Sequence, residues 1–97
     1  MRNTGIKHIV LEEITVLAKK YDITKIILFG SRARGGFHKT SDIDLAVTGG
    51  DIIRFTLDIN ENTSTLLKYD IVNLNAPVNG NLRTEIDKEG RVIYEKN

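Results

Sequence analysis

The chain contains no cysteine and only one proline among its 97 residues. Without cysteine it has no disulfide bonds, no thiolate metal ligands and no thiol nucleophile, as is common in a reducing compartment. It also lacks an apolar run near the ~20 residues of a membrane-spanning helix, and no signal peptide opens it. We therefore expect a cytoplasmic protein that does not bind a membrane.

An excess of one charge sign is also lacking. The 14 Lys and Arg residues against 13 Asp and Glu residues give a formal net charge of +1. A chain so close to neutral has no general basic field to attract nucleic acid, so a nucleic-acid partner is not expected. The hydrophobic content of 40% and charged content of 28% are typical of a globular protein. We expect one domain, residues 1–97, with a modest core.

Hydrophobic periodicity predicts alternating helices and strands. Apolar side chains recur every three or four residues over residues 6–21, which indicates an amphipathic helix, and residues 1–5 are expected to be a loose end. The unbroken apolar run from Ile26 to Phe29 predicts a central strand, Lys25–Phe29, covered on both faces. The remaining expected elements are a strand carrying Asp42 and Asp44, a helix capped by Asp51 and ending near Asn62, a strand over residues 66–74, a helix over residues 81–89 and an edge strand over residues 92–94.

This order of elements predicts an α/β domain of the α+β type, with a mixed sheet of about four strands and helices packed on it. The connection between the first two strands is short for a parallel crossover, so we expect those strands to be antiparallel. The second and third strands are separated by a helix and should be parallel. Asp70, on the third strand, would then lie beside Asp42 and Asp44.

Asp42 and Asp44 are two residues apart, so on a strand they share one face, while Ile43, Leu45 and Val47 share the other. Like charges held side by side disfavour their own ionisation unless a cation lies between them. Their oxygen ligands suit Mg²⁺ or Mn²⁺, with substrate phosphates completing the shell. Taken alone, an Asp-x-Asp pair is more often a polar strand end than a metal site.

Gly30 and Ser31 form an abrupt turn after the first strand. Glycine lets a ligand approach the backbone closely, Ser31 is a good N-cap, and the amides of a following helical turn can bind an anion. Arg32 and Arg34 would place positive charge against the helix dipole, so we interpret both as ligands of a bound phosphate. Removing either should then leave the stability of the unliganded fold unchanged or slightly raised. Solvated arginines in a strand-to-helix turn are the alternative.

Asp70 is a lone acidic residue inside the apolar segment of the third expected strand. A charge in such a segment is seldom left unpaired, which makes Asp70 a candidate site residue. A strand-edge aspartate paired with a lysine is an equally simple explanation from these residues alone.

The spacing of Gly30-Ser31, ten residues and then Asp42-x-Asp44 resembles the signature of the nucleotidyltransferase superfamily that includes DNA polymerase β and kanamycin nucleotidyltransferase. The fuller string, GSRARG followed by SDIDL, is similar to the minimal nucleotidyltransferase (MNT) family in particular. The resemblance extends over residues 26–94 and implies the nucleotidyltransferase fold and a nucleotide site.

The resemblance implies an enzyme that binds ATP, or another nucleoside triphosphate, with Mg²⁺ or Mn²⁺ and transfers AMP to a hydroxyl, releasing pyrophosphate. Gly30 and Ser31 would hold the β- and γ-phosphates, and Asp42 and Asp44 would hold the metal. Asp70 matches the family's third carboxylate, which would support the metal and activate the acceptor hydroxyl.

Larger relatives have a second domain that grips the base or the acceptor, and this chain has no sequence for one, so we expect the acceptor on a partner. In the MNT family that partner resembles a HEPN-domain ribonuclease toxin, which is inactivated by AMP added to a tyrosine. The alternative function is a non-catalytic antitoxin that occludes its partner and binds nucleotide only structurally. Occlusion requires none of the four residues that favour the enzyme, namely Ser31, Asp42, Asp44 and Asp70. A DNA-repair or polymerase role is disfavoured by the near-neutral charge.

Overall fold

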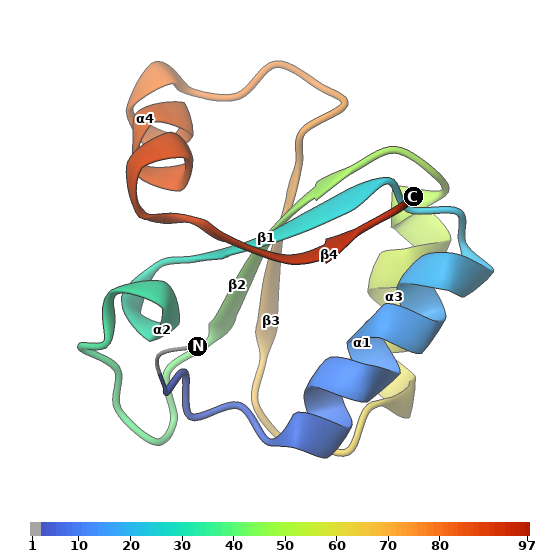
Figure 1. Cartoon of the computed structure of the whole chain (residues 1–97), viewed down its shortest axis with the longest axis horizontal. Coiled ribbons are helices and arrows are strands. Elements are labelled where there is room, and N and C mark those ends of the chain that lie inside the picture. Colours follow the sequence, from blue (N-terminus) through green and yellow to red (C-terminus); the bar gives the residue numbers. More distant parts are fainter. Residues whose placement is uncertain (1–2) are drawn as a thin grey trace.

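A computed structural model describes residues 3–97, which fold as alternating helices and strands (Figure 1). The elements in chain order are α1 (His8–Lys20), β1 (Lys25–Phe29), α2 (Ser31–Arg34), β2 (Ile43–Thr48), α3 (Ile52–Asn62), β3 (Tyr69–Asn73), α4 (Gly80–Glu89) and β4 (Arg91–Glu95). The strands form one mixed sheet in the order β3-β2-β1-β4. The predicted fold class is confirmed.

Strand pairing places the predicted acidic residues on neighbouring strands. β1 runs antiparallel to β2 and to β4, and β2 runs parallel to β3, as predicted from the lengths of the connections. In this register Phe29 pairs with Asp44, and Asp44 pairs with Asp70. The first three strands therefore bring the end of β1 and two carboxylates to the same part of the sheet.

Helices cover both faces of the sheet, as Figure 1 shows with α1 and α3 side by side on one face and α4 on the other. The larger core lies under α1 and α3 and includes Ile14, Phe55, Ile43 and Leu45, all fully buried. A smaller cluster of Phe29, Ala46 and Ile86 lies under α4. Side chains alternate between the faces of a strand, so Asp44, between Ile43 and Leu45, lies on the α4 face.

Sequence signals locate most helix boundaries correctly. The Asp51 carboxylate accepts a hydrogen bond from the Arg54 amide at 3.1 Å, and α3 ends at Asn62 as predicted. α4 begins one residue earlier than predicted because the Asn79 side chain caps it. Gly90 ends α4 in an extended conformation with φ −68°, and not in the left-handed conformation expected of a glycine cap.

The strand predicted over residues 66–74 is shorter in the structure, because β3 spans only Tyr69–Asn73. Side chains satisfy the backbone before it: Glu13 accepts from the Ser64 amide at 2.7 Å, and the Thr65 hydroxyl accepts from the Leu67 amide at 3.1 Å. These local bonds offer the backbone an alternative to the sheet, so the segment remains a loop.

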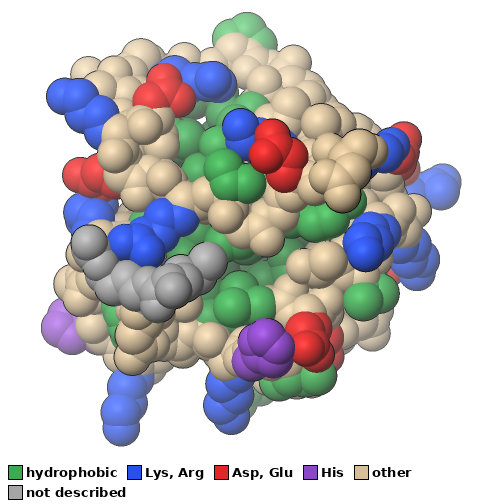
Figure 2. Space-filling view, in the orientation of Figure 1, with side chains coloured by type: hydrophobic (Ala, Val, Ile, Leu, Met, Phe, Trp, Pro, Cys, Tyr) green, Lys and Arg blue, Asp and Glu red, His purple; other side chains and the backbone are tan. Residues whose placement is uncertain are grey.

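Charges of both signs are mixed over the surface. Figure 2 shows acidic side chains next to basic or histidine side chains on the face it presents. Lys25 pairs with Glu95 at 3.8 Å and Arg83 with Asp87 at 3.4 Å. Among residues 3–97, no helix has both the length and the apolar character needed to cross a membrane.

A hydrogen-bonded carboxylate joins the end of α1 to α3. The Asp58 side chain is 10% exposed. It accepts hydrogen bonds from the Tyr21 hydroxyl at 2.5 Å, the side-chain amide of Asn62 at 2.6 Å and the Lys20 ammonium at 3.1 Å. The Tyr21 bond, followed by those from Asn62 and Lys20, lowers the pKa of Asp58 to about 2. Each bond favours the ionised form, so the contact stabilises the fold only while Asp58 is charged.

This contact predicts an acid-dependent loss of stability. The folded-state pKa lies below the unfolded value of ~3.9, so the contribution is fully present above pH ~4 and declines as the pH falls toward about 2. Asp58→Asn should therefore lower the free energy of unfolding at pH 6. At pH 3 the free energies of unfolding of the mutant and the wild type should lie closer together. Urea unfolding at both pH values checks this, and an equal difference at both would contradict it.

Candidate active site

The turn at the end of β1 brings the backbone against Asp44. Gly30 has a φ of 73°, and a Cβ atom built on it would overlap the Asp44 carboxylate. Only glycine tolerates both the positive φ and this close approach. Gly30 itself is the N-cap of α2, and Ser31 is its first helical residue, which corrects the prediction of Ser31 as the N-cap. The half-buried Ser31 therefore opens α2 beside a carboxylate.

The three predicted acidic residues differ in burial. Asp44 is half-buried on β2, whereas Asp42, just before β2, and Asp70, on the edge strand β3, are exposed. Burial, followed by the charges of Asp70, Asp42 and Glu85, raises the pKa of Asp44 to about 6, while Arg34 opposes the shift. The structure thus brings Asp42, Asp44 and Asp70 into one negatively charged region.

Glu85 is the member of this region that the sequence analysis missed. It lies on α4, half-buried, next to Ile86, whose side chain packs into the core cluster under that helix. Leu82 and Ile86 are four residues apart and define the buried face of α4, so their spacing is the signal that could have placed Glu85 at the sheet. Which part of the sheet it meets depends on how α4 packs.

Arg32 does not extend into solvent. Its side chain is 1% exposed, and its guanidinium donates to the carbonyl oxygens of Thr4 at 2.9 Å, Ser41 at 3.0 Å, Lys39 at 3.2 Å and His38 at 3.4 Å. The interpretation of Arg32 as a phosphate ligand is therefore corrected. Its donors bind the backbone of the loop that follows α2 and of the segment that precedes α1.

The same contact corrects the expected loose end. Residues 1–2 lie outside the described part of the chain, but Thr4 is 5% exposed and its carbonyl is held by Arg32. The Phe37 ring lies 4.9 Å from the guanidinium carbon, a cation–π distance. Thr4 and Gly5 are thus part of the packed structure around Arg32.

Arg34 lies at the edge of the acidic region. It is 46% exposed and pairs with Glu89 of α4 at 3.0 Å, and its charge lowers the pKa of Asp44. Since α2 has only four residues, its dipole is small, and both arginines have partners within the fold. Their position near a helix start therefore no longer argues for a phosphate, and nucleotide binding by Arg34 stays a prediction.

The donors in the acidic region fit a hard cation. Within residues 3–97, no three acidic or histidine side chains form a ready-made cage for a metal ion. Mg²⁺ usually takes only one or two protein carboxylates and completes its octahedral shell with phosphates and water. Donors of this kind are supplied by Asp42, Asp44 and Asp70. The charges of Asp42 and Asp70 disfavour the ionised form of Asp44, and a bound cation would relieve this repulsion.

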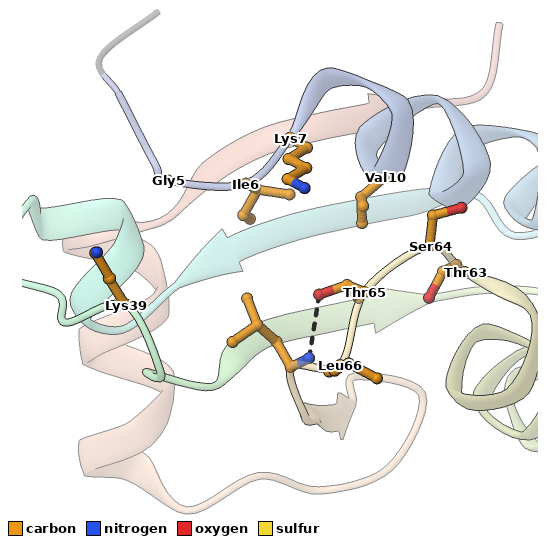
Figure 3. A pocket seen from close by; sticks show the side chains of 10 residues that line it. Gly5, Ile6, Lys7, Val10, Lys39, Thr63, Ser64, Thr65 and Leu66 are labelled. Carbon is orange, nitrogen blue, oxygen red and sulfur yellow. Dashed lines mark hydrogen bonds between the residues drawn. The ribbon is translucent and has the colours of Figure 1, made fainter.

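A groove of about 590 Å³ lies between the start of α1 and the segment that precedes β3 (Figure 3). Lys7 and Val10 line one side of it, Thr65 and Leu66 another, and Lys39 lies at one end. Leu66 also lines a second hollow of about 430 Å³ that reaches Asp42. The groove and this second hollow share Leu66 and Leu67, so together they extend from the start of α1 to Asp42.

Comparisons with known proteins agree with this geometry. The family model described as polymerase beta, nucleotidyltransferase matches residues 12–97. A curated relative from Methanocaldococcus jannaschii, named as a protein adenylyltransferase, is 36% identical in a 94-residue alignment that covers 86% of this chain and 92% of the relative. This match and the family model confirm the resemblance drawn from the sequence.

Solved structures share the fold. A toxin–antitoxin crystallised with AMP-PNP superposes with a TM-score of 0.71 at 23% identity, over 89% of this chain and 73% of the other. A nucleotidyltransferase from Sulfolobus solfataricus superposes with a TM-score of 0.58 at 21% identity, over 96% of this chain and 85% of the other.

The two arginines should differ in their effect on stability. Arg32→Ala should lower the free energy of unfolding of the unliganded protein by about 2–4 kcal/mol, since it leaves buried carbonyls without donors. Arg34→Ala removes an exposed ion pair and should change it by less than about 1 kcal/mol. Urea denaturation at pH 7 measures both, and an Arg32→Ala protein as stable as wild type would refute the buried contact.

Proposed function

Because this chain belongs to the polymerase beta nucleotidyltransferase family, we propose that it transfers AMP from ATP to a hydroxyl group of a partner protein. The observation that carries the proposal is the pairing of Asp44 with Asp70 on neighbouring strands, directly beside the Gly30 turn. The relative named as a protein adenylyltransferase supports a protein as the acceptor.

Gly30 and Ser31 form the phosphate end of the proposed site. Gly30 has no side chain, so a phosphate can approach the backbone there, and Ser31 offers a hydroxyl and an amide at the first position of α2. Together they would hold the β- and γ-phosphates and leave the α-phosphate toward Asp44. The triphosphate would therefore be bound by two uncharged residues, Gly30 and Ser31.

The acidic residues form the metal end of the proposed site. Asp42, Asp44 and Asp70 would hold Mg²⁺ or Mn²⁺, which supplies charge neutralisation between the carboxylates and the triphosphate. Burial is the largest cause of the raised pKa of Asp44, and the neighbouring charges of Asp70, Asp42 and Glu85 come next. A cation would relieve this second contribution, which supports the assignment. Glu85 adds to that negative field from α4.

Asp70 is the proposed general base. Its carboxylate is exposed on the edge strand β3, where a hydroxyl of another molecule can reach it. Asp70 takes the proton of that hydroxyl, and the oxygen attacks the α-phosphorus of ATP. The bond from the α-phosphorus to the bridging oxygen breaks, and pyrophosphate leaves. The residues contribute mainly position and charge, which dominate phosphoryl transfer.

We further propose a HEPN-domain toxin as the partner, with a tyrosine as the acceptor and the cytoplasm as the setting. Support comes from the toxin–antitoxin crystallised with AMP-PNP and from a toxin–antitoxin described as MntA-HpeT, which superposes with a TM-score of 0.70 at 21% identity. In this proposal the chain is the antitoxin, and the added AMP inactivates the toxin.

Nucleotide binding should require a divalent cation. The phosphates and the clustered carboxylates repel each other without one, so ATP affinity should fall by at least ~10-fold when EDTA replaces Mg²⁺. Calorimetric titration of the protein with ATP in the two conditions measures this. Equal affinity in both would contradict the metal assignment of Asp42, Asp44 and Asp70.

Asp70 and Asp42 should separate catalysis from binding. Asp70→Asn should retain the fold and most ATP binding, because Asp42 and Asp44 still hold the metal, but it should lower AMP transfer by at least ~100-fold, the usual effect of losing a general base. Asp42→Asn should weaken ATP binding and transfer together. The assay combines α-labelled ATP with the HEPN partner and reads AMP addition from the intact mass of that partner.

Asp87→Asn is the matched control, because Asp87 is 59% exposed on α4 and pairs with Arg83. It should transfer AMP like wild type. If the wild type adds no AMP to its partner but still inhibits it, and both mutants inhibit it equally, the enzymatic proposal is wrong. The protein is then the non-catalytic antitoxin that occludes its partner.

A further inference from the structure

We propose that Arg32 is a positioning residue of the nucleotide site, which holds Ser31 and the Asp42–Asp44 pair in their working arrangement from inside the fold. The inference rests on the proposed function, since the arrangement it explains is that of the proposed triphosphate and metal site. Arg32 touches neither ligand in this account. It acts through the backbone of the residues that do.

Arg32 bridges the two ends of the loop that separates the two motifs. It directly follows Ser31, and its Nε atom donates to the carbonyl of Ser41, the residue just before Asp42, at 3.0 Å. Its Nη2 atom donates to the carbonyls of Lys39 and His38 in the same loop. One planar group therefore sets how far the loop can move from the start of α2.

The loop has few other anchors. Gly35, Gly36 and residues 38–40 are exposed, and Gly35 has a φ of 97°. The bonds made by Ser41 to His38 are internal to the loop and do not tie it to α2. A segment with two adjacent glycines has wide conformational freedom, so the path of the loop up to Asp42 depends on the guanidinium, while the Ile43 amide after Asp42 is held by the Lys68 carbonyl at 2.8 Å.

A third segment closes over the same group. Nη1 of Arg32 donates to the Thr4 carbonyl, and a Cβ on Gly5 would overlap the Phe37 ring that packs on the guanidinium. Gly5 and Lys39 line the groove described above from different segments (Figure 3). Arg32 thus holds two of the segments that line that groove, and one of them is the loop that leads to Asp42.

The chemistry of the contact requires arginine. The guanidinium has a rigid fork of donors that can reach carbonyls in several directions, whereas an ammonium is a point charge on a flexible stem. Among residues 3–97 no carboxylate forms a salt bridge with Arg32, so its buried charge is balanced mainly by carbonyl dipoles, with the Phe37 ring and the charge of Asp44 as further favourable partners. Burial of a cation is costly even though its removal would leave the carbonyls without donors, so a fold that needed only stability could use an apolar side chain here, and the arginine is explained by the geometry it imposes.

Arg32→Lys tests geometry against charge, because it keeps the positive charge and loses the fork. We expect its affinity for Mg²⁺–ATP to fall by at least ~10-fold under conditions where it is folded. The control is Ile14→Val, a truncation on α1 in the core that lies on the other face of the sheet from Asp44, which should lower the melting temperature but keep the wild-type affinity. Calorimetry gives both affinities, and amide resonances of Ser31 and Asp42 should shift only in Arg32→Lys.

An Arg32→Lys protein that is folded and binds Mg²⁺–ATP like wild type overturns the inference while leaving the proposed function intact. If wild type itself binds no Mg²⁺–ATP, the proposed function fails and the inference fails with it. If Arg32→Lys does not fold, Phe37→Leu takes its place, since it removes the ring from the guanidinium and spares every hydrogen bond. A smaller loss of affinity than ~10-fold is then expected, and unchanged affinity overturns the inference.

Discussion

The antiparallel pairing of β1 with β2 is the constraint on which the rest of the site depends. Its register sets Asp44 opposite Phe29, so the carboxylate returns to the residue before Gly30 and lies against the turn. The chain between the strands must therefore leave and re-enter the sheet at neighbouring points. Three features make this path possible: the absence of a side chain at Gly30, the single helical turn of α2, and the buried guanidinium of Arg32, which closes the loop.

Much of this arrangement could be predicted from the sequence because it depends on local rules. Alternation of Asp42 and Asp44 with Ile43 and Leu45 fixes the two faces of one strand, and the short connection before it excludes a parallel crossover. A helix between β2 and β3 makes them parallel, which places Asp70 next to Asp44. The confirmed family resemblance rests on the same residues, whose chemical roles are still predictions.

What could not be predicted depends on partners distant in the chain. An arginine after Gly-Ser looks like a phosphate ligand, because nothing nearby in sequence shows that the carbonyls of Thr4 and Ser41 surround it in the fold. Glu85 was missed for a related reason, since only the packing of α4 brings it to Asp44. Asp70 was predicted in an apolar strand, yet it is exposed because β3 lies at the edge of the sheet.

The two faces of the sheet also separate the residues that stabilise the fold from the residues of the proposed site. The large core that holds the fold together lies under α1 and α3, while the acidic residues lie on the side of α4 and at the open edge of β3. Substitution of an exposed aspartate therefore costs the fold little. A lineage could lose the chemistry through one such change and still keep a scaffold able to bind a partner. Enzyme and inert inhibitor are thus separated by a short evolutionary distance in this architecture.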